Sequence, residues 1–216
     1  MCYDASTSRN AFLIGIASSW VLYHQPIPNA KIFGVFLAYT ALMQAFDYIF
    51  WTNPPPSTVN KVATKSAAVV NLLLPFVLYL TLVYYKKQVS PLSRSISYLY
   101  LIGLLGYLWY NWSRIIETKV TPRSSPSLDW EWTHLSYSSI GAIVYLLTML
   151  LMISVEITGS IKYLLIALVS LTYWFSYQKH HLAQTSGRFW CYFGAFYPLV
   201  ILGYIFVSSK IKNKLE

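Results

Sequence analysis

Acidic residues and cysteines are scarce in this sequence, and both shortages limit what the protein can be. Only seven of the 216 residues are Asp or Glu, and charged residues make up 11% of the chain, whereas soluble domains carry about 25%. The two cysteines, Cys2 and Cys191, cannot form a disulfide framework. We expect two free thiols, with a single disulfide as the alternative. The composition therefore excludes an ordinary soluble domain and a disulfide-stabilised secreted one.

Recognisable catalytic and metal-binding motifs are also missing. The sequence has no His-Glu-x-x-His, no Cys-x-x-Cys, no Gly-x-Ser-x-Gly and no glycine-rich phosphate loop. His180 and His181 are adjacent, so they cannot share one helical face, and His24 and His134 are isolated. We therefore expect no metal site and no cofactor. Enzymatic activity stays an open question, because scattered His and Ser residues are compatible with a membrane-embedded lipid-modifying enzyme.

Apolar residues dominate instead. Hydrophobic residues make up 56% of the chain and the mean hydropathy is +0.47, which indicates an integral membrane protein. Seven apolar runs are separated by prolines or charged residues, and about 20 apolar residues cross a bilayer as a helix. We predict an all-α bundle of about seven transmembrane helices in a single domain over 1–216. The predicted spans are 10–24, 31–51, 66–85, 96–112, 135–155, 161–178 and 189–208.

Two prolines suggest an internal repeat. Pro75 and Pro198 lie inside the third and seventh runs, and both are flanked by aromatic and aliphatic residues. This spacing is compatible with a three-plus-one-plus-three parallel repeat, of the kind that some transporters use. The alternative is a chance match, because proline and glycine are common in membrane helices.

The longest polar segment, 115–133, separates the fourth and fifth runs. It ends in the acidic and aromatic stretch Asp129-Trp130-Glu131-Trp132. Tryptophans beside membrane spans commonly lie at the level of the lipid headgroups. We therefore expect a surface loop whose tryptophans belong to this interfacial belt.

One carboxylate, Asp47, lies inside the second apolar run, about 6 Å from its end at a rise of 1.5 Å per residue. An Asp at the centre of a membrane helix costs about 3 kcal/mol, and less towards the interface. Gln44 and Thr40 share one helical face with Asp47, so we predict that this face contacts protein or water and not lipid. This polar stripe of Thr40, Gln44 and Asp47 is either a pathway or ligand site, or a buried structural network of hydrogen bonds.

Further candidates lie at a similar predicted depth. Pro75 has no N–H to donate to the carbonyl of Asn71, so this carbonyl and the Asn71 amide could bind an ion or a polar solute. The alternative is that neighbouring helices or water satisfy both groups. Arg114 and Arg188 are assigned to the same membrane face, and we expect one of them to be the countercharge of Asp47. Because these polar groups gather near one membrane face, we predict a water-filled vestibule on that side with Asp47 at its floor.

Basic residues give the chain a formal charge of +9, and they stand at the ends of apolar runs. That pattern indicates interfacial anchors and does not indicate a nucleic-acid surface. Eight basic residues fall on each side of the predicted bundle, so the positive-inside rule does not decide the orientation. Lys86-Lys87 and the lysines of the C-terminal tail favour a cytoplasmic C-terminus.

Four motifs in the first third of the chain carry a resemblance to a known group of proteins. They are Ile14-Gly15-x-x-Ser18-Ser19, Lys31-Ile32-Phe33-Gly34, Leu42-Met43-Gln44-x-x-Asp47-Tyr48-x-x-Trp51-x-Asn53 and Asn60-Lys61-x-x-Thr64. This pattern resembles uncharacterised multi-pass membrane proteins of giant DNA viruses. The resemblance implies a viral or host internal membrane, and it brings no activity and no catalytic residues. The possible repeat also looks like the PQ-loop and sugar-efflux transporters, but their Pro-Gln signature is missing here.

Two functional hypotheses follow. The first is a channel or transporter for a small polar solute, a proton or a cation, with Gln44, Asp47 and Asn71 at the site. The second is a non-enzymatic structural or interaction protein of a viral or host membrane, in which Asp47 holds the bundle together. Expected partners are the lipid bilayer, ions or a small polar solute, and other copies of the chain in a homo-oligomer, but no nucleic acid. Transport predicts a water-accessible cavity that reaches Asp47, whereas a structural role predicts a buried and paired Asp47.

Overall fold

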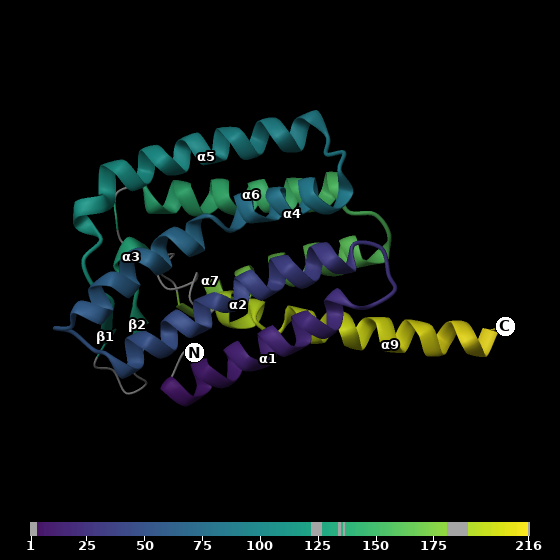
Figure 1. Cartoon of the computed structure of the whole chain (residues 1–216), viewed down its shortest axis with the longest axis horizontal. Helices are drawn as coiled ribbons and strands as arrows, with labels where there is room; N and C mark the ends of the chain where they lie inside the picture. Colours follow the sequence, from purple (N-terminus) through teal and green to yellow (C-terminus); the bar gives the residue numbers. More distant parts are fainter. Residues whose placement is uncertain (1–3, 122–126, 134, 136, 181–189, 216) are drawn as a thin grey trace.

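The computed structural model describes residues 4–121, 127–133, 135, 137–180 and 190–215. In these residues the chain is all-α apart from one short hairpin, and its eight helices of 13 residues or more lie roughly side by side (Figure 1). The predicted all-α class is therefore confirmed. The helices are α1 (Ala5–Tyr23), α2 (Ala30–Thr52), α3 (Thr58–Leu72), α4 (Leu74–Lys86), α5 (Pro91–Asn111), α6 (Ser138–Glu156), α7 (Ser160–His180) and α9 (Tyr197–Leu215). Residues 190–194 are also helical and lead through a turn at 195–196 into α9.

Residues 66–85, predicted as one span, do not form one straight helix, because the structure divides them between α3 and α4, which are bent by 53°. Pro75 is the second residue of α4, where its missing N–H leaves no hydrogen bond unmade. Tyrosines satisfy carbonyls at the break: Tyr39 Oη donates to Val70 O at 3.1 Å and Tyr100 Oη to Leu72 O at 2.6 Å. Neighbouring helices thus satisfy backbone groups that the break would otherwise leave exposed to an apolar environment.

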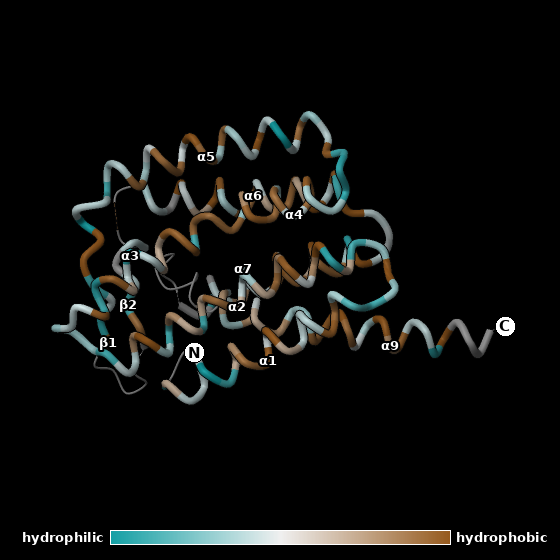
Figure 2. The backbone as a smooth tube through the Cα atoms, viewed as in Figure 1, coloured by the Kyte–Doolittle hydropathy of each residue, from teal (hydrophilic) through white to brown (hydrophobic). Residues whose placement is uncertain are grey.

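Length and composition identify fewer membrane spans than the sequence pattern does. Two described helical segments, Ala30–Thr52 and Trp190–Ile211, are long and apolar enough to cross a membrane, and α3 with α4 makes a third if the bent pair is one span. The segments Ile140–Glu156 and Ser160–Ser176 are apolar but shorter. Figure 2 shows hydrophobic residues along the helices and hydrophilic residues at their connecting turns. Two or three candidate spans are therefore shown, and a bundle of seven goes beyond this.

Small residues bring α1 and α2 into the closest helix–helix contact of the described structure. The buried face of α1 carries Ser8, Ala11, Gly15, Ser18 and Ser19, and small side chains let two helix backbones approach closely. Two glycines mark the approach. A Cβ at Gly15 would lie 2.8 Å from Ala41 Cβ, and one at Gly34 would lie 2.6 Å from Tyr23 Cβ. Any larger residue at these two positions would force the helices apart.

The segment 115–133 is not the surface loop that the sequence suggested. Strands β1 (Lys119–Thr121) and β2 (Ser127–Asp129) form an antiparallel hairpin, in which Val120 lies opposite Leu128. Trp130 is 0% exposed and Trp132 is 2% exposed, so their expected place in an interfacial belt is wrong. Both tryptophans pack instead in a buried cluster with Met43 and Phe50 of α2.

Asn60 of α3 pins this segment to the helices. Its amide Nδ2 donates to Asn53 O at 3.0 Å and to Thr118 O at 3.1 Å, and its Oδ1 accepts from Thr118 N at 2.9 Å. Thr64, one turn further along α3, exchanges a hydroxyl hydrogen bond with Thr118 at 3.0 Å. Asn60, Thr64 and Thr118 are all completely buried, so this network fixes the start of the hairpin segment against the bundle.

Candidate functional site

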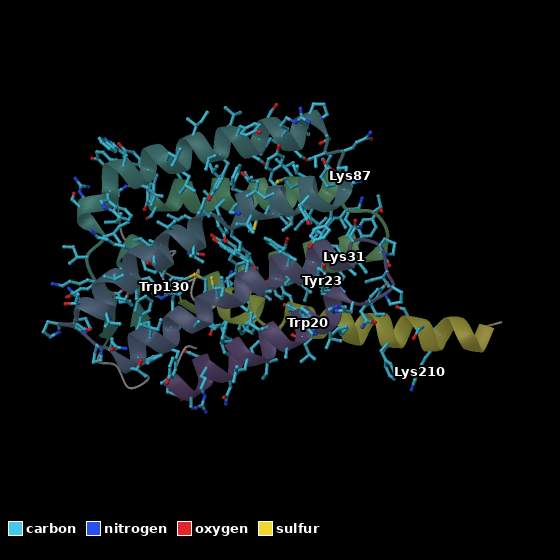
Figure 3. The ribbon with its side chains drawn as sticks, in the orientation of Figure 1. Trp20, Tyr23, Lys31, Lys87, Trp130 and Lys210 are labelled. Carbon is cyan, nitrogen blue, oxygen red and sulfur yellow. The ribbon has the colours of Figure 1, made fainter. Side chains whose placement is uncertain are left out.

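Asp47 forms the centre of a closed polar contact between α2 and the hairpin segment. Its carboxylate is completely buried and accepts from Trp130 Nε1 at 3.0 Å and from Gln44 Nε2 at 3.3 Å. The Trp130 ring stacks on Trp132, with ring centroids 5.0 Å apart. Figure 3 labels Trp130 inside the bundle, beside α2. A buried carboxylate needs such charge-assisted hydrogen bonds to offset the loss of its hydration.

The stripe that contains Asp47 faces protein, which is one of the two surroundings, protein or water, that the sequence predicted. Gln44 is completely buried, and Thr40 is 7% exposed. Thr40 Oγ1 donates within its own helix to Phe36 O at 3.0 Å. Gly194 lies so close to Thr40 that an added Cβ would come within 3.0 Å of Thr40 Cγ2.

Of the two residues expected as the countercharge of Asp47, Arg114 is the one among the described residues. Arg114 is exposed in a short 3-10 helix, η1 (Trp112–Arg114), and its guanidinium lies 5.0 Å from the centroid of the Tyr110 ring. Arg188 lies outside the described residues. Two of the groups that bond the Asp47 carboxylate, Trp130 and Gln44, are uncharged donors.

A large cleft lies elsewhere, between α5, α6 and α7. It has a volume of about 1330 Å³ and ends at Asn71, Trp190 and Cys191. Gly103 and Gly106 of α5 and Gly141 of α6 line it, and an added Cβ would meet nothing within 4 Å at any of them. Much of the remaining surface is apolar, including Leu99, Ile140 and Trp174. Asp47 is not among the described residues that line this cleft.

The polar groups of the cleft are uncharged. None of its described lining residues is Asp, Glu, Lys, Arg or His. Four of them carry a buried polar atom without a hydrogen-bond partner in the described structure: Asn111 Oδ1, Trp132 Nε1, Tyr145 Oη and Trp190 Nε1. Such orphaned atoms are rare in proteins, and each costs about 1–3 kcal/mol. The cleft thus combines a wide apolar surface with a few neutral donors and acceptors just beneath it.

Asn71 links the cleft to a second, smaller cavity. This inner cavity has a volume of about 30 Å³ and lies between α2, α4, α6, α7 and α9. Asn71, Trp190 and Cys191 line both cavities, and Thr40 lines the inner one. Cys191 Sγ donates to Asn71 Oδ1 at 3.8 Å, and the buried Cys191 is a free thiol. Cys2 lies outside the described residues.

The structure therefore divides the candidates from the sequence. Asn71 and Thr40 reach a cavity, Gln44 and Asp47 belong to the contact with Trp130, and Pro75 is a buried residue in the first turn of α4. The cleft itself was not predicted, although Gly103, Gly106 and Gly141 were visible in the sequence. No group of three or more His, Cys, Asp or Glu side chains among the described residues could hold a metal ion.

Comparisons with protein-family profiles, with curated proteins and with solved structures found no match to this chain. The resemblance to membrane proteins of giant DNA viruses stays a prediction.

Proposed function

We propose that this chain is a multi-pass membrane protein that binds a small, uncharged and largely apolar solute in the cleft between α5, α6 and α7. The observation that carries this proposal is the cleft itself, which is open enough for a ligand and has no charged side chain among its described lining residues. Its volume of about 1330 Å³ exceeds the range of about 300–1,000 Å³ that is usual for small-molecule sites. An amphiphile with a bulky apolar part and a neutral hydrogen-bonding group fits this chemistry best.

The membrane arrangement is part of the same proposal. All seven apolar segments cross the bilayer, with α3 and α4 together as one broken span and the C-terminus on the cytoplasmic side. The breaks support a three-plus-one-plus-three arrangement: Pro75 is the second residue of α4, which follows the α3 break, and Pro198 is the second residue of α9, which follows the turn at 195–196. Each half then contains one proline-started helix, with α5 between the halves.

In this proposal Asp47 is structural. Its complete burial and its bonds to Trp130 and Gln44 support the alternative expectation, a paired carboxylate that holds the bundle together. The cleft makes a small solute a better candidate for transport than a proton or a cation. Asn71 and Cys191 line both the cleft and the inner cavity, so the two cavities adjoin at these residues. A polar proton or cation route would have to reach Asp47 through the packed side chains around it.

Ligand retention tests the proposal. Purified protein is extracted with organic solvent, and the bound small molecules are compared by mass spectrometry between wild type, Gly141→Phe and Gly203→Phe. Both glycines have open space around them, but Gly141 lines the cleft and Gly203, on α9, does not. We expect an uncharged amphiphile in wild type and in Gly203→Phe, and at least tenfold less of it in Gly141→Phe. Equal retention in all three proteins, or a charged ligand lost only from Gly141→Phe, would contradict the proposal.

A further inference from the structure

One end of the bundle carries basic residues with almost no accessible acid among the residues that the structure describes. This basic end consists of the turns between α1 and α2, α4 and α5, and α6 and α7, together with the C-terminal half of α9. Each of the three turns is next to at least one lysine, and the labelled side chains of Lys31, Lys87 and Lys210 lie towards this end (Figure 3). The basic residues with described side chains here are Lys31, Lys86, Lys87, Arg94, Lys162 and Lys210. The sequence of α9 continues with Lys212 and Lys214.

Glu156 is the one acidic residue at the basic end among the described residues, and its carboxylate is already paired with Lys86. Its carboxylate accepts from Lys86 Nζ at 2.9 Å and from Ser90 N at 2.9 Å, and its side chain is 3% exposed. Lys86 also donates to Glu156 O at 2.6 Å. The exposed lysines at this end therefore face no exposed acidic side chain among the described residues.

The opposite end has a different balance. Three acidic residues that are not buried lie there among the described residues: Asp4, Glu117 and Asp129. The basic residues at this end are Arg9, Lys61, Lys65, Arg114 and Lys119. Equal numbers of basic residues were assigned to the two sides of the bundle from the sequence, but the two ends differ in net charge. A count of Lys and Arg alone does not show this difference, because the acidic residues gather at the hairpin end.

Three lysines of the basic end are also placed beside aromatic rings, of which Tyr163 and Phe206 are exposed. Their Nζ atoms lie 5.9 Å from the Tyr23 ring for Lys31, 5.2 Å from Tyr163 for Lys162 and 4.4 Å from Phe206 for Lys210. Such pairs place an aromatic ring at the edge of the apolar region and a cation in the headgroup region. The C-terminal part of α9, which carries Phe206 and Lys210, also projects beyond the other helices (Figure 1).

We propose that the basic end binds the headgroups of anionic phospholipids in one leaflet. Basic residues next to membrane spans attract acidic lipids within about one Debye length, roughly 8 Å at physiological salt. The ligand is an anionic phospholipid at the membrane surface, which differs in charge and in place from the uncharged solute of the cleft. This contact also orients the protein, because the cytoplasmic leaflet is the negatively charged one.

Lipid titration with matched variants tests this site. Detergent-solubilised protein is titrated with phosphatidylglycerol or with phosphatidylcholine, and the lipid adducts are measured by native mass spectrometry. One triple variant carries Lys31→Gln, Lys162→Gln and Lys210→Gln at the basic end. Its control carries Lys61→Gln, Lys65→Gln and Lys119→Gln at the hairpin end, so that both proteins lose three charges.

We expect wild type to bind phosphatidylglycerol at least about fivefold more tightly than phosphatidylcholine at low salt. This is about the gain in affinity that a single lysine near an anionic membrane surface contributes. The basic-end variant should lose most of this preference, the control should keep it, and 0.5 M salt should weaken it.

Equal binding of both lipids to wild type would overturn the proposal, as would an equal loss in the control. Displacement of the lipid by millimolar inorganic phosphate would also overturn it, because the surface would then be a free-anion site. Gly141→Phe should keep the preference, which separates this result from the fate of the cleft.

Discussion

Glycines serve opposite purposes in two regions of this molecule. Where α1 meets α2, a Cβ at Gly34 would lie 2.6 Å from the Cβ and 2.8 Å from the Cα of Tyr23, so the glycine is what allows the contact. In the α5–α6 region, Gly103 and Gly141 border open space, and the glycines widen a cleft. The same residue type thus allows close packing in one region, called here the rigid region, and leaves open space in the other, the open region. The buried Asp47 contact belongs to the rigid region.

The largest expected effect comes from the rigid region. Gly34→Ala places a methyl group against the backbone of α1, and overpacking of this kind costs about 1–3 kcal/mol or more. We expect the higher part of that range, because Tyr23 Cα and Ser19 O cannot rotate away. Thermal or denaturant unfolding in detergent measures it. A loss below 0.5 kcal/mol, the usual size of a neutral surface change, would show that α1 and α2 are not in close contact.

The Asp47 contact should give the next largest effect. Trp130→Phe removes one donor to a buried carboxylate, and Asp47→Asn removes the charge, so each should cost about 1.5–3 kcal/mol. Because the two groups bond each other, the double variant should be less destabilised than the sum of the single variants by about 1 kcal/mol or more. Unfolding of the four proteins measures this coupling. Strict additivity would mean that Trp130 and Asp47 do not interact.

A third, smaller effect sharpens the boundary of the rigid region. Asn60→Ala leaves buried Thr118 groups without their partner, which should cost about 1–3 kcal/mol and free the start of the hairpin segment. Hydrogen exchange over residues 115–121 should accelerate more than exchange in α1. Thr52→Ala is the matched control, because the Thr52 hydroxyl is exposed, donates to carbonyls of its own helix and accepts from the side chain of the next residue, Asn53. Unchanged exchange in Asn60→Ala would separate this network from the hairpin.

The smallest effect has the opposite sign and comes from the open region. Gly103→Ala adds a methyl group where no atom lies within 4 Å, and replacing a helical glycine by alanine stabilises a helix by about 0.5–1 kcal/mol. The same substitution should therefore raise stability at Gly103 and lower it at Gly34. Unfolding of both single variants side by side measures the contrast. If Gly103→Ala destabilised the protein as much as Gly34→Ala does, the two regions would not differ in packing.

Much of the helix framework could be predicted from local sequence. Long apolar runs interrupted by proline or charge marked the helices, and the stripe of Thr40, Gln44 and Asp47 predicted a face turned towards protein or water and away from lipid. Pro75 predicted a disturbed helix, because a missing N–H and a fixed ring act on their immediate neighbours. These features depend on residues within a few positions of each other.

Contacts between distant segments were beyond such patterns. Trp130 was expected at the membrane interface, but it bonds Asp47, which is 83 positions away in the chain. Nothing local to Trp130 distinguishes a tryptophan that is buried against a carboxylate from one that lies among lipid headgroups. The cleft was missed for a related reason, because a void depends on how far apart α5, α6 and α7 lie. The sequence showed the glycines but not the spacing of the helices.

The central claim is that the carboxylate belongs to the rigid region and that solutes use the open one. Proton and cation flux into liposomes that contain wild-type protein or Asp47→Asn tests it most directly. We predict no flux that depends on Asp47, together with a lower unfolding temperature for the variant. A proton or cation flux that wild type supports and that a well-folded Asp47→Asn protein loses would contradict the account and make Asp47 part of a pathway.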